Sequence, residues 1–144
     1  MRAPFPTIHG CALIVGDAGL LIRGASGSGK SSLTLALLEQ AQAQGRFARL
    51  VADDRVGLTL NAGQLIAAPH PVIAGQIEKR GIGILSLPHQ SAVKLTHVID
   101  LLPETQSAAP QMGRITIQGV ELGHFEIPAG APLKAATQAL LAKI

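Results

Sequence analysis

The chain contains 144 residues, a length that suits one domain with a sizeable hydrophobic core. Hydrophobic residues make up 47% and charged residues 15%, which is too apolar for a disordered chain, yet no apolar run of about 18 residues predicts a membrane span. The net charge of +3 comes from scattered basic residues with few aromatic neighbours, which argues against nucleic-acid binding. We expect one globular domain over residues 1–144, with neither a nucleic-acid nor a membrane partner.

The first residues carry no targeting signal that we can identify. Residues 1–6 contain one charge and no apolar segment, so we expect a cytoplasmic protein. The single cysteine, Cys11, lies in an apolar run and is predicted to be a small core residue rather than a reactive thiol. Because the chain has three Phe and neither Trp nor Tyr, the core must consist of Leu, Ile, Val and Ala.

The first half of the chain predicts a strand hairpin, a helix and a further strand. Short apolar stretches at Cys11–Val15 and Leu20–Ile22 flank a Gly-rich turn typical of a hairpin. Residues Lys30–Ala41 have apolar side chains at helical spacing and on a wide face, so this helix is expected to be largely buried. Phe47–Ala52 predicts a buried strand that ends at two aspartates.

The second half predicts two more hairpins and a terminal helix. The segment from Gln76 to Ile84 places charged and polar groups before a glycine-spaced apolar run, which is unusual for either a helix or a strand. The remaining predictions are a hairpin of Val56–Leu60 with Gln64–Ala67, a strand at Lys94–Leu102, a mobile loop at Pro103–Gly113, a hairpin of Ile115–Ile117 with Val120–Leu122, and a helix at Leu133–Ile144.

One motif, at residues 24–31, carries most of the chemical information. Lys30 of this motif should reach the β and γ phosphates of a nucleotide, and the Ser31 hydroxyl should ligate Mg²⁺. A strand before the motif and a helix after it supply the context that this function requires, because the helix N-terminus attracts phosphate. The motif fits G-x-x-x-x-G-K-[ST] and consists of Gly24, Ala25, Ser26, Gly27, Ser28, Gly29, Lys30 and Ser31.

Two adjacent carboxylates follow the next predicted strand. Asp53 and Asp54 stand where P-loop proteins usually carry a carboxylate near Mg²⁺. Adjacent residues of an extended chain point to opposite sides, so we expect the two aspartates to have different partners. The alternative is a polar turn that only ends the strand.

Three further residues are candidates for the site. Glu78 is a candidate Mg²⁺ ligand and Arg80 a candidate clamp on phosphate, although a surface ion pair would explain both. His9 could orient a carboxylate, with a turn residue as the alternative. The other histidines lack the spacing of zinc ligands; they are His70, His89, His97 and His124.

Four segments together resemble a known family. Ile8-His9-Gly10, the motif at 24–31, the run at 50–54 ending in Asp53-Asp54, and Glu78-Lys79-Arg80-Gly81-Ile82-Gly83-Ile84 occur in this order. Their order and spacing resemble the catalytic domain of bacterial HPr kinase/phosphorylase. The resemblance covers about residues 7 to 86 and is more specific than the P-loop alone.

The resemblance implies a fold and an activity. The fold would be an α/β P-loop domain with a mixed, hairpin-rich sheet around the P-loop helix, similar to phosphoenolpyruvate carboxykinase. The enzyme would use ATP and Mg²⁺ to phosphorylate a serine of HPr, the phosphocarrier of the sugar phosphotransferase system, and could remove that phosphate by phosphorolysis. A homo-oligomer, commonly a hexamer, is expected, in a short form that lacks the N-terminal domain of longer members.

The resemblance also implies residue roles. Asp54 would accept the proton during phosphorylation and return it in the reverse reaction, with His9 beside Asp53 and Asp54. Ser31 and Glu78 would hold Mg²⁺, and Lys30 would contact phosphate. Arg80 lies in the segment 77–86 that would serve both reactions.

Departures from the family pattern leave alternatives open. A catalytic arginine expected within 102–107 is absent, with Arg114 the nearest substitute, and the loop at 127–132 contains no Lys or Arg, which argues against phosphorolysis. Lys79 replaces the usual aliphatic residue. The alternatives are a small-molecule P-loop kinase and an ATP-sensing regulatory module without transfer activity, the latter favoured by the missing arginine.

Overall fold

A six-stranded mixed sheet forms the centre of the fold in the computed structural model, which describes residues 7–79, 81–103 and 111–144. Its strands are β2 (Cys11–Val15), β3 (Ala18–Arg23), β4 (Ala48–Ala52), β10 (His97–Leu102), β11 (Gln111–Ile117) and β12 (Val120–Pro128). They are ordered β11-β12-β10-β3-β2-β4. β10 runs parallel to β3 and β12, whereas β2 is antiparallel to β3 and β4. The sheet is therefore mixed, as the sequence predicts.

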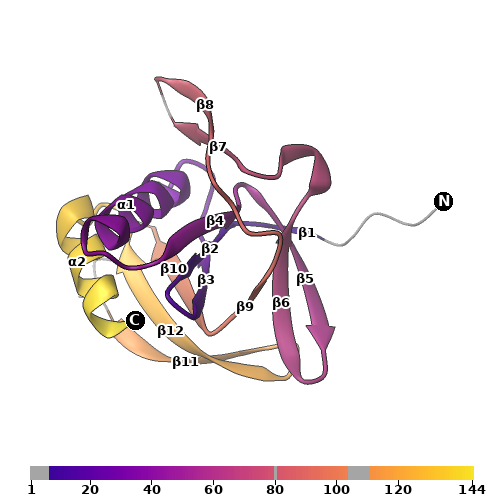
Figure 1. Ribbon diagram of the computed structural model, residues 1–144. Helices are drawn as coiled ribbons and strands as arrows, with labels where there is room; N and C mark the ends of the chain where they lie inside the picture. Colours follow the sequence, from indigo (N-terminus) through magenta and orange to yellow (C-terminus); the bar gives the residue numbers. More distant parts are fainter. Residues whose placement is uncertain (1–6, 80, 104–110) are drawn as a thin grey trace.

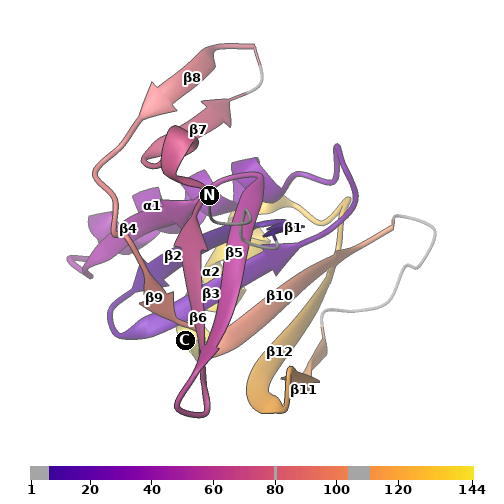
Figure 2. The same ribbon diagram turned by 90° about the vertical axis from the view of Figure 1, so that its right-hand side faces the viewer.

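Two smaller sheets complete the β structure. A four-stranded sheet has the order β1-β5-β6-β9. Its strands are β1 (Thr7–His9), β5 (Arg55–Asn61), β6 (Gln64–Pro69) and β9 (Val93–Lys94). A two-stranded hairpin consists of β7 (Gln76–Lys79) and β8 (Gly83–Ser86), and it follows a short 3₁₀ turn at Pro71–Ile73. This hairpin projects from the rest of the molecule in both views (Figures 1 and 2).

The helices and the four-stranded sheet lie on opposite faces of the six-stranded sheet. The helices are α1 (Lys30–Ala43) and α2 (Leu133–Lys143). Figure 1 shows both helices on one side and the β5–β6 hairpin on the other. Along β3, Leu20 and Ile22 pack in the core beneath the helices, whereas Leu21 packs in the core beneath the four-stranded sheet. This alternation explains why β3 is apolar at successive positions.

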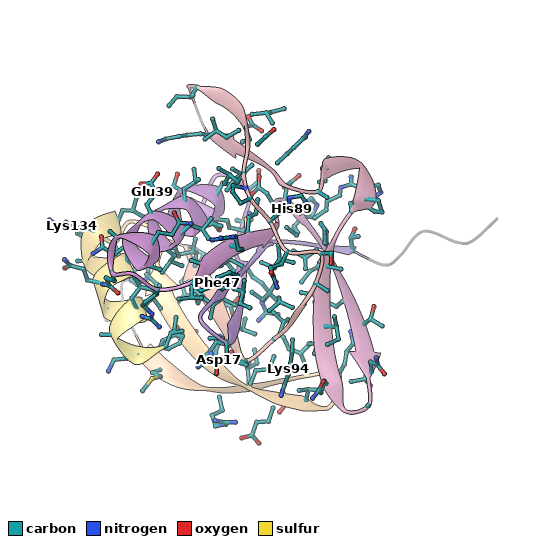
Figure 3. All side chains as sticks on the ribbon, viewed as in Figure 1. Asp17, Glu39, Phe47, His89, Lys94 and Lys134 are labelled. Atoms are coloured by element: carbon teal, nitrogen blue, oxygen red, sulfur yellow. The ribbon has the colours of Figure 1, made fainter. Side chains whose placement is uncertain are left out.

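The hairpins, the helices and the aliphatic core agree with the sequence predictions. The described core contains a single phenylalanine, Phe125, among Leu, Ile, Val, Ala and Cys side chains. The predicted start of β4 is wrong, because the strand begins at Ala48 and Phe47 lies on the surface with 46% exposure (Figure 3). The Arg49 guanidinium stands 4.7 Å from the centre of the Phe47 ring, a cation–π contact that partly covers the ring.

Two other predicted boundaries are wrong. The strand expected at Lys94–Leu102 is divided, because β9 belongs to the four-stranded sheet and β10 to the six-stranded sheet. Between them the amide of Leu95 bonds the Leu65 carbonyl and the amide of Thr96 bonds the Gly19 carbonyl, so the chain crosses from one sheet to the other. The loop expected at Pro103–Gly113 is also shorter than predicted, since β11 begins at Gln111; residues 104–110 lie outside the described part.

Candidate active site

The loop between β3 and α1 occupies residues 24–29. Gly27 and Gly29 have φ values of 79° and 97°, a left-handed conformation that glycine adopts without a steric penalty. Gly24 is needed for space, because a Cβ there would lie 2.6 Å from the Ser28 hydroxyl. The glycines of the motif therefore let the chain turn tightly and enter α1 at Lys30.

Lys30 is held at the mouth of this loop. Its Nζ donates hydrogen bonds to the carbonyl oxygens of Gly24 and Ala25, at 3.0 and 3.2 Å. The first amides of α1 have no acceptor within the helix, so they attract negative charge, as the ammonium does. The loop and the helix start thus form a site suited to an anion with several oxygens.

Asp53 lies next to Ser31, and only 7% of it is exposed. Its Oδ1 accepts a hydrogen bond from Ser31 Oγ at 2.7 Å and one from Cys11 Sγ at 3.0 Å. Its Oδ2 accepts a hydrogen bond from the backbone amide of Glu78 at 3.1 Å. Three separate segments are therefore joined through this one carboxyl group.

Cys11 is a core residue with no exposed surface, as predicted, but its thiol also contacts the site. Burial, together with the nearby charge of Asp53, raises the pKa of the Cys11 thiol to about 12. The thiol therefore keeps its proton near neutral pH and acts as a hydrogen-bond donor. No sequence pattern predicts this contact, because 42 positions separate the two residues.

Asp54 faces solvent instead. It has a φ of 68°, so the Asp53–Asp54 turn is not the extended chain assumed above, and the left-handed residue sends the two side chains apart. The amide of Gly10 donates to the Asp54 carbonyl at 3.1 Å and fixes this turn. His9 Nδ1 lies 3.8 Å from Asp54 Oδ1, and these side chains are 79% and 68% exposed. The two aspartates have different partners, as expected, for a different geometric reason.

Glu78 reaches the same place from the projecting hairpin. Buried Ile77 anchors β7 in the core beneath α1, and the neighbouring Glu78 is exposed at the site. Ile84, which pairs with Glu78 across the hairpin, and Ile82 in the turn are 69% and 66% exposed. Arg80 lies outside the described residues.

One cavity of about 390 Å³ collects most of the predicted side chains. Its walls are mainly polar. Its walls bring Lys30 together with three carboxyl groups, so one ammonium faces up to three negative charges. The lining residues are Ser26, Gly27, Gly29, Lys30, Ser31, Ser32, Asp53, Asp54 and Glu78.

The cavity's donor set fits a hard cation that accompanies phosphate. Hydroxyl and carboxyl oxygens are ligands of Mg²⁺, which commonly takes one or two carboxylates plus phosphate oxygens and water. Within residues 7–79, 81–103 and 111–144, no cluster of three His, Cys, Asp or Glu side chains is arranged to hold a metal by itself. A cation bound there would take its remaining ligands from water or phosphate oxygens.

Two other predicted features lie away from this cavity. Arg114, on β11, forms an ion pair with Glu121 of the adjacent strand and does not line the cavity. The predicted loop at 127–132 does not line the cavity either: Ile127 and Pro128 end β12, and Pro132 precedes α2.

Neither helix in the described residues is long and apolar enough to cross a membrane.

Comparison with known proteins places this arrangement in a family. A family model described as the HPr Serine kinase C-terminal domain matches residues 2–128. The chain belongs to this family. Its resemblance to HPr kinase/phosphorylase, noted from four sequence segments, is therefore confirmed.

Curated relatives share the family across longer chains. The HPr kinase/phosphorylase of Clostridium tetani is 38% identical over 99 residues, which cover 69% of this chain and 30% of that protein. The one from Mycoplasma mycoides subsp. mycoides is 29% identical over 143 residues, covering 90% of this chain and 44% of that protein. The chain thus spans less than half the length of these two members of the HPr kinase family.

A solved structure has the same fold. The Hpr(Ser) kinase/phosphatase from Coxiella burnetii matches with a TM-score of 0.79 and 26% identity, covering 96% of this chain and 95% of the other. The mixed α/β fold with several sheets is therefore shared with an HPr kinase.

Proposed function

We propose that this chain is a protein-serine kinase that transfers the γ-phosphoryl group of ATP to a serine of HPr. The observation that carries the proposal is the cavity in which the 24–29 loop, Lys30 and Ser31 meet Asp53, Asp54 and Glu78. A phosphate-binding loop beside a proton acceptor is what phosphoryl transfer requires. Family membership supports HPr as the acceptor.

The nucleotide phosphates would bind at the loop. The backbone amides at 24–29 and the start of α1 would donate to phosphate oxygens, and the Lys30 ammonium would leave its carbonyl partners to contact the transferred group. Ser31 and Glu78 would hold Mg²⁺, which when bound offsets phosphate charge that the three carboxyl groups would otherwise repel. Asp53 would keep Ser31 in place through the 2.7 Å hydrogen bond.

Asp54 is the better proton acceptor of the two aspartates. The oxygens of Asp53 already accept three hydrogen bonds, whereas Asp54 is exposed and open to an incoming serine. As the serine oxygen forms its bond to the γ-phosphorus, the bond to the β-phosphate oxygen breaks, the serine proton passes to Asp54, and ADP leaves. His9 would orient Asp54 from 3.8 Å.

The proposal also covers the domain, the role of Arg80, the oligomeric state and the cellular compartment. Residues 1–144 would act as one P-loop kinase domain, with a loop and helix similar to those of phosphoenolpyruvate carboxykinase. Arg80 would clamp phosphate, the enzyme would act as a homo-oligomer, a hexamer in our proposal, and it would meet HPr in the cytoplasm. Phosphorolysis, against which the uncharged loop at 127–132 argues, would be a separate reaction: inorganic phosphate would attack the phosphoserine phosphorus, pyrophosphate would leave, and Asp54 would return the proton to the serine oxygen.

Intact-mass spectrometry of HPr tests the proposal. We expect one phosphate on an HPr serine after incubation with this protein, ATP and Mg²⁺, and none with the Lys30→Ala variant. Tight ATP binding without transfer would contradict the kinase proposal and favour the regulatory module. Turnover stimulated by a metabolite and not by HPr would favour the small-molecule kinase.

A further inference from the structure

A second cavity opens beside the loop at residues 24–29, on the side of the loop near α2. It has a volume of about 190 Å³ and lies between the start of α1 and the turn that joins β12 to α2. The start of α1 contributes Gly29 and Ser32, and the opposite wall includes Ala129 and Leu133. We call this cavity the α1–α2 groove.

The groove adjoins the cavity of about 390 Å³ at Lys30, which we call the phosphate cavity. Gly29 and Ser32 line both cavities, so the first turn of α1 is the boundary that they share. Lys30 and Ser31 line only the phosphate cavity, whereas Ser28 and Leu33 line only the groove. A ligand with its phosphates at Lys30 can therefore extend past the helix start into the groove.

The walls of the groove suit a flat, weakly polar group. Leu101 and Ile127 form a buried apolar floor, and Leu133 stands at the opening with 44% of its surface exposed. Ser28 also lines the groove, and its hydroxyl, buried beside Gly24, has no hydrogen-bond partner among the described residues. Because a buried hydroxyl without a partner costs free energy, this group gains from a ligand that can donate or accept a hydrogen bond.

We propose that the α1–α2 groove binds the base and adjoining sugar of the nucleoside triphosphate, with the base against the aliphatic walls and the buried Ser28 side chain turning to bond a polar atom of the base or sugar. This inference rests on the proposed function, since the triphosphate must first occupy the 24–29 loop. Aliphatic walls with a few polar groups are typical of small-molecule sites. No aromatic residue lines the groove within the described part of the chain, so the base is held by packing and not by ring stacking.

Comparing ATP with tripolyphosphate separates binding of the base from binding of the phosphates. The test variant is Ala129→Phe, which places a large ring in the groove from a turn whose amide bonds the Leu102 carbonyl at 2.8 Å. We expect calorimetry to show ATP affinity at least about tenfold weaker, and tripolyphosphate affinity within about twofold of the unmodified protein. The matched control is Ala135→Phe, at an exposed position on α2 that does not line the groove. It should change neither affinity.

A second variant covers the case in which Ala129→Phe does not fold. Leu133→Ala removes an exposed side chain from the wall of the groove. It should lower the affinity for ATP about threefold and leave the affinity for tripolyphosphate unchanged. Unchanged ATP affinity in the folded groove variants would overturn the inference, as would an equal loss of both ligands. Equal affinity of the unmodified protein for ATP and tripolyphosphate would also overturn it while supporting the phosphate site. Failure to bind either ligand would instead contradict the proposed function on which the inference rests.

Discussion

The Cys11 thiol donates a hydrogen bond to Asp53, with Sγ 3.0 Å from Oδ1. Cys11 begins β2, immediately after Gly10, whose amide bonds the Asp54 carbonyl. The start of β2 therefore holds the Asp53–Asp54 turn by one backbone and one side-chain hydrogen bond. A residue expected to serve only the core thus supports the carboxyl group that positions Ser31.

Replacing Cys11 with alanine removes the thiol donor. We expect the Mg²⁺ concentration that gives half-maximal nucleotide binding to rise by about tenfold, because groups that support metal ligands commonly have effects of this size. For Cys11→Ser this Mg²⁺ concentration should stay within about threefold of that of the unmodified protein, since the serine hydroxyl is also a donor. Calorimetry of ATP binding at graded Mg²⁺ checks both variants.

The control for this experiment is Val15→Ala, which truncates a buried side chain at the other end of β2. It should lose stability from the smaller core without a change in Mg²⁺ dependence. If Cys11→Ala shows the same Mg²⁺ dependence as Val15→Ala, the thiol acts only as core packing.

Lys30→Ala should weaken ATP binding by at least about tenfold and abolish transfer, because no other ammonium lines the described part of the phosphate cavity. Calorimetry measures the affinity. Lys134→Ala, at an exposed position on α2, removes the same charge away from the cavity and should bind ATP normally. Equal ATP affinity of the two variants would show that Lys30 does not bind the phosphates.

Asp54→Asn should bind ATP with affinity within about threefold of the unmodified protein, yet lower the transfer rate by about 10² or more, the usual contribution of a general base. Single-turnover transfer to HPr measures the rate. Asp17→Asn, in the exposed turn between β2 and β3, controls for loss of a surface carboxylate. Full activity of Asp54→Asn would exclude Asp54 as the proton acceptor.

Asp100 gives a prediction for acid stability. Burial acts to raise its pKa, but hydrogen bonds from Arg23 and His124 outweigh burial and lower the pKa below the ordinary value of about 3.9. A lowered folded-state pKa contributes stability above pH 4 that is lost as the pH falls through the folded-state value. Asp100→Asn should therefore be less stable at pH 7, by about 2 kcal/mol.

Denaturant unfolding at several pH values measures this difference. The difference in the free energy of unfolding between the unmodified protein and Asp100→Asn should become smaller below pH 4. Burial, with the charge of Arg114, also lowers the pKa of His97, so acid destabilises both proteins through His97 and that contribution cancels in the difference. A difference in the free energy of unfolding that stays constant from pH 7 to pH 2.5 would contradict a stabilising role of the Asp100 carboxylate.

Local sequence patterns predicted β2 and the start of α1 because those elements depend on neighbouring residues. Cys11–Val15 is apolar between turn residues, and Lys30 follows glycines that only a tight turn requires. The start of β11 and the division of Lys94–Leu102 were mispredicted. Their boundaries depend on partner strands distant in sequence, such as the Gly19 carbonyl that bonds Thr96.

By itself the sequence determined the glycine-rich motif at 24–31, which we expect to bind phosphate, the aliphatic character of the core and the candidate residues Asp53, Asp54 and Glu78. The tertiary structure alone decided how those carboxyl groups divide their tasks. It buries Asp53 under donors from three segments and turns Asp54 toward solvent through a left-handed residue. Residue type and spacing record which groups a chain carries, whereas burial and hydrogen bonding arise only when distant segments pack together.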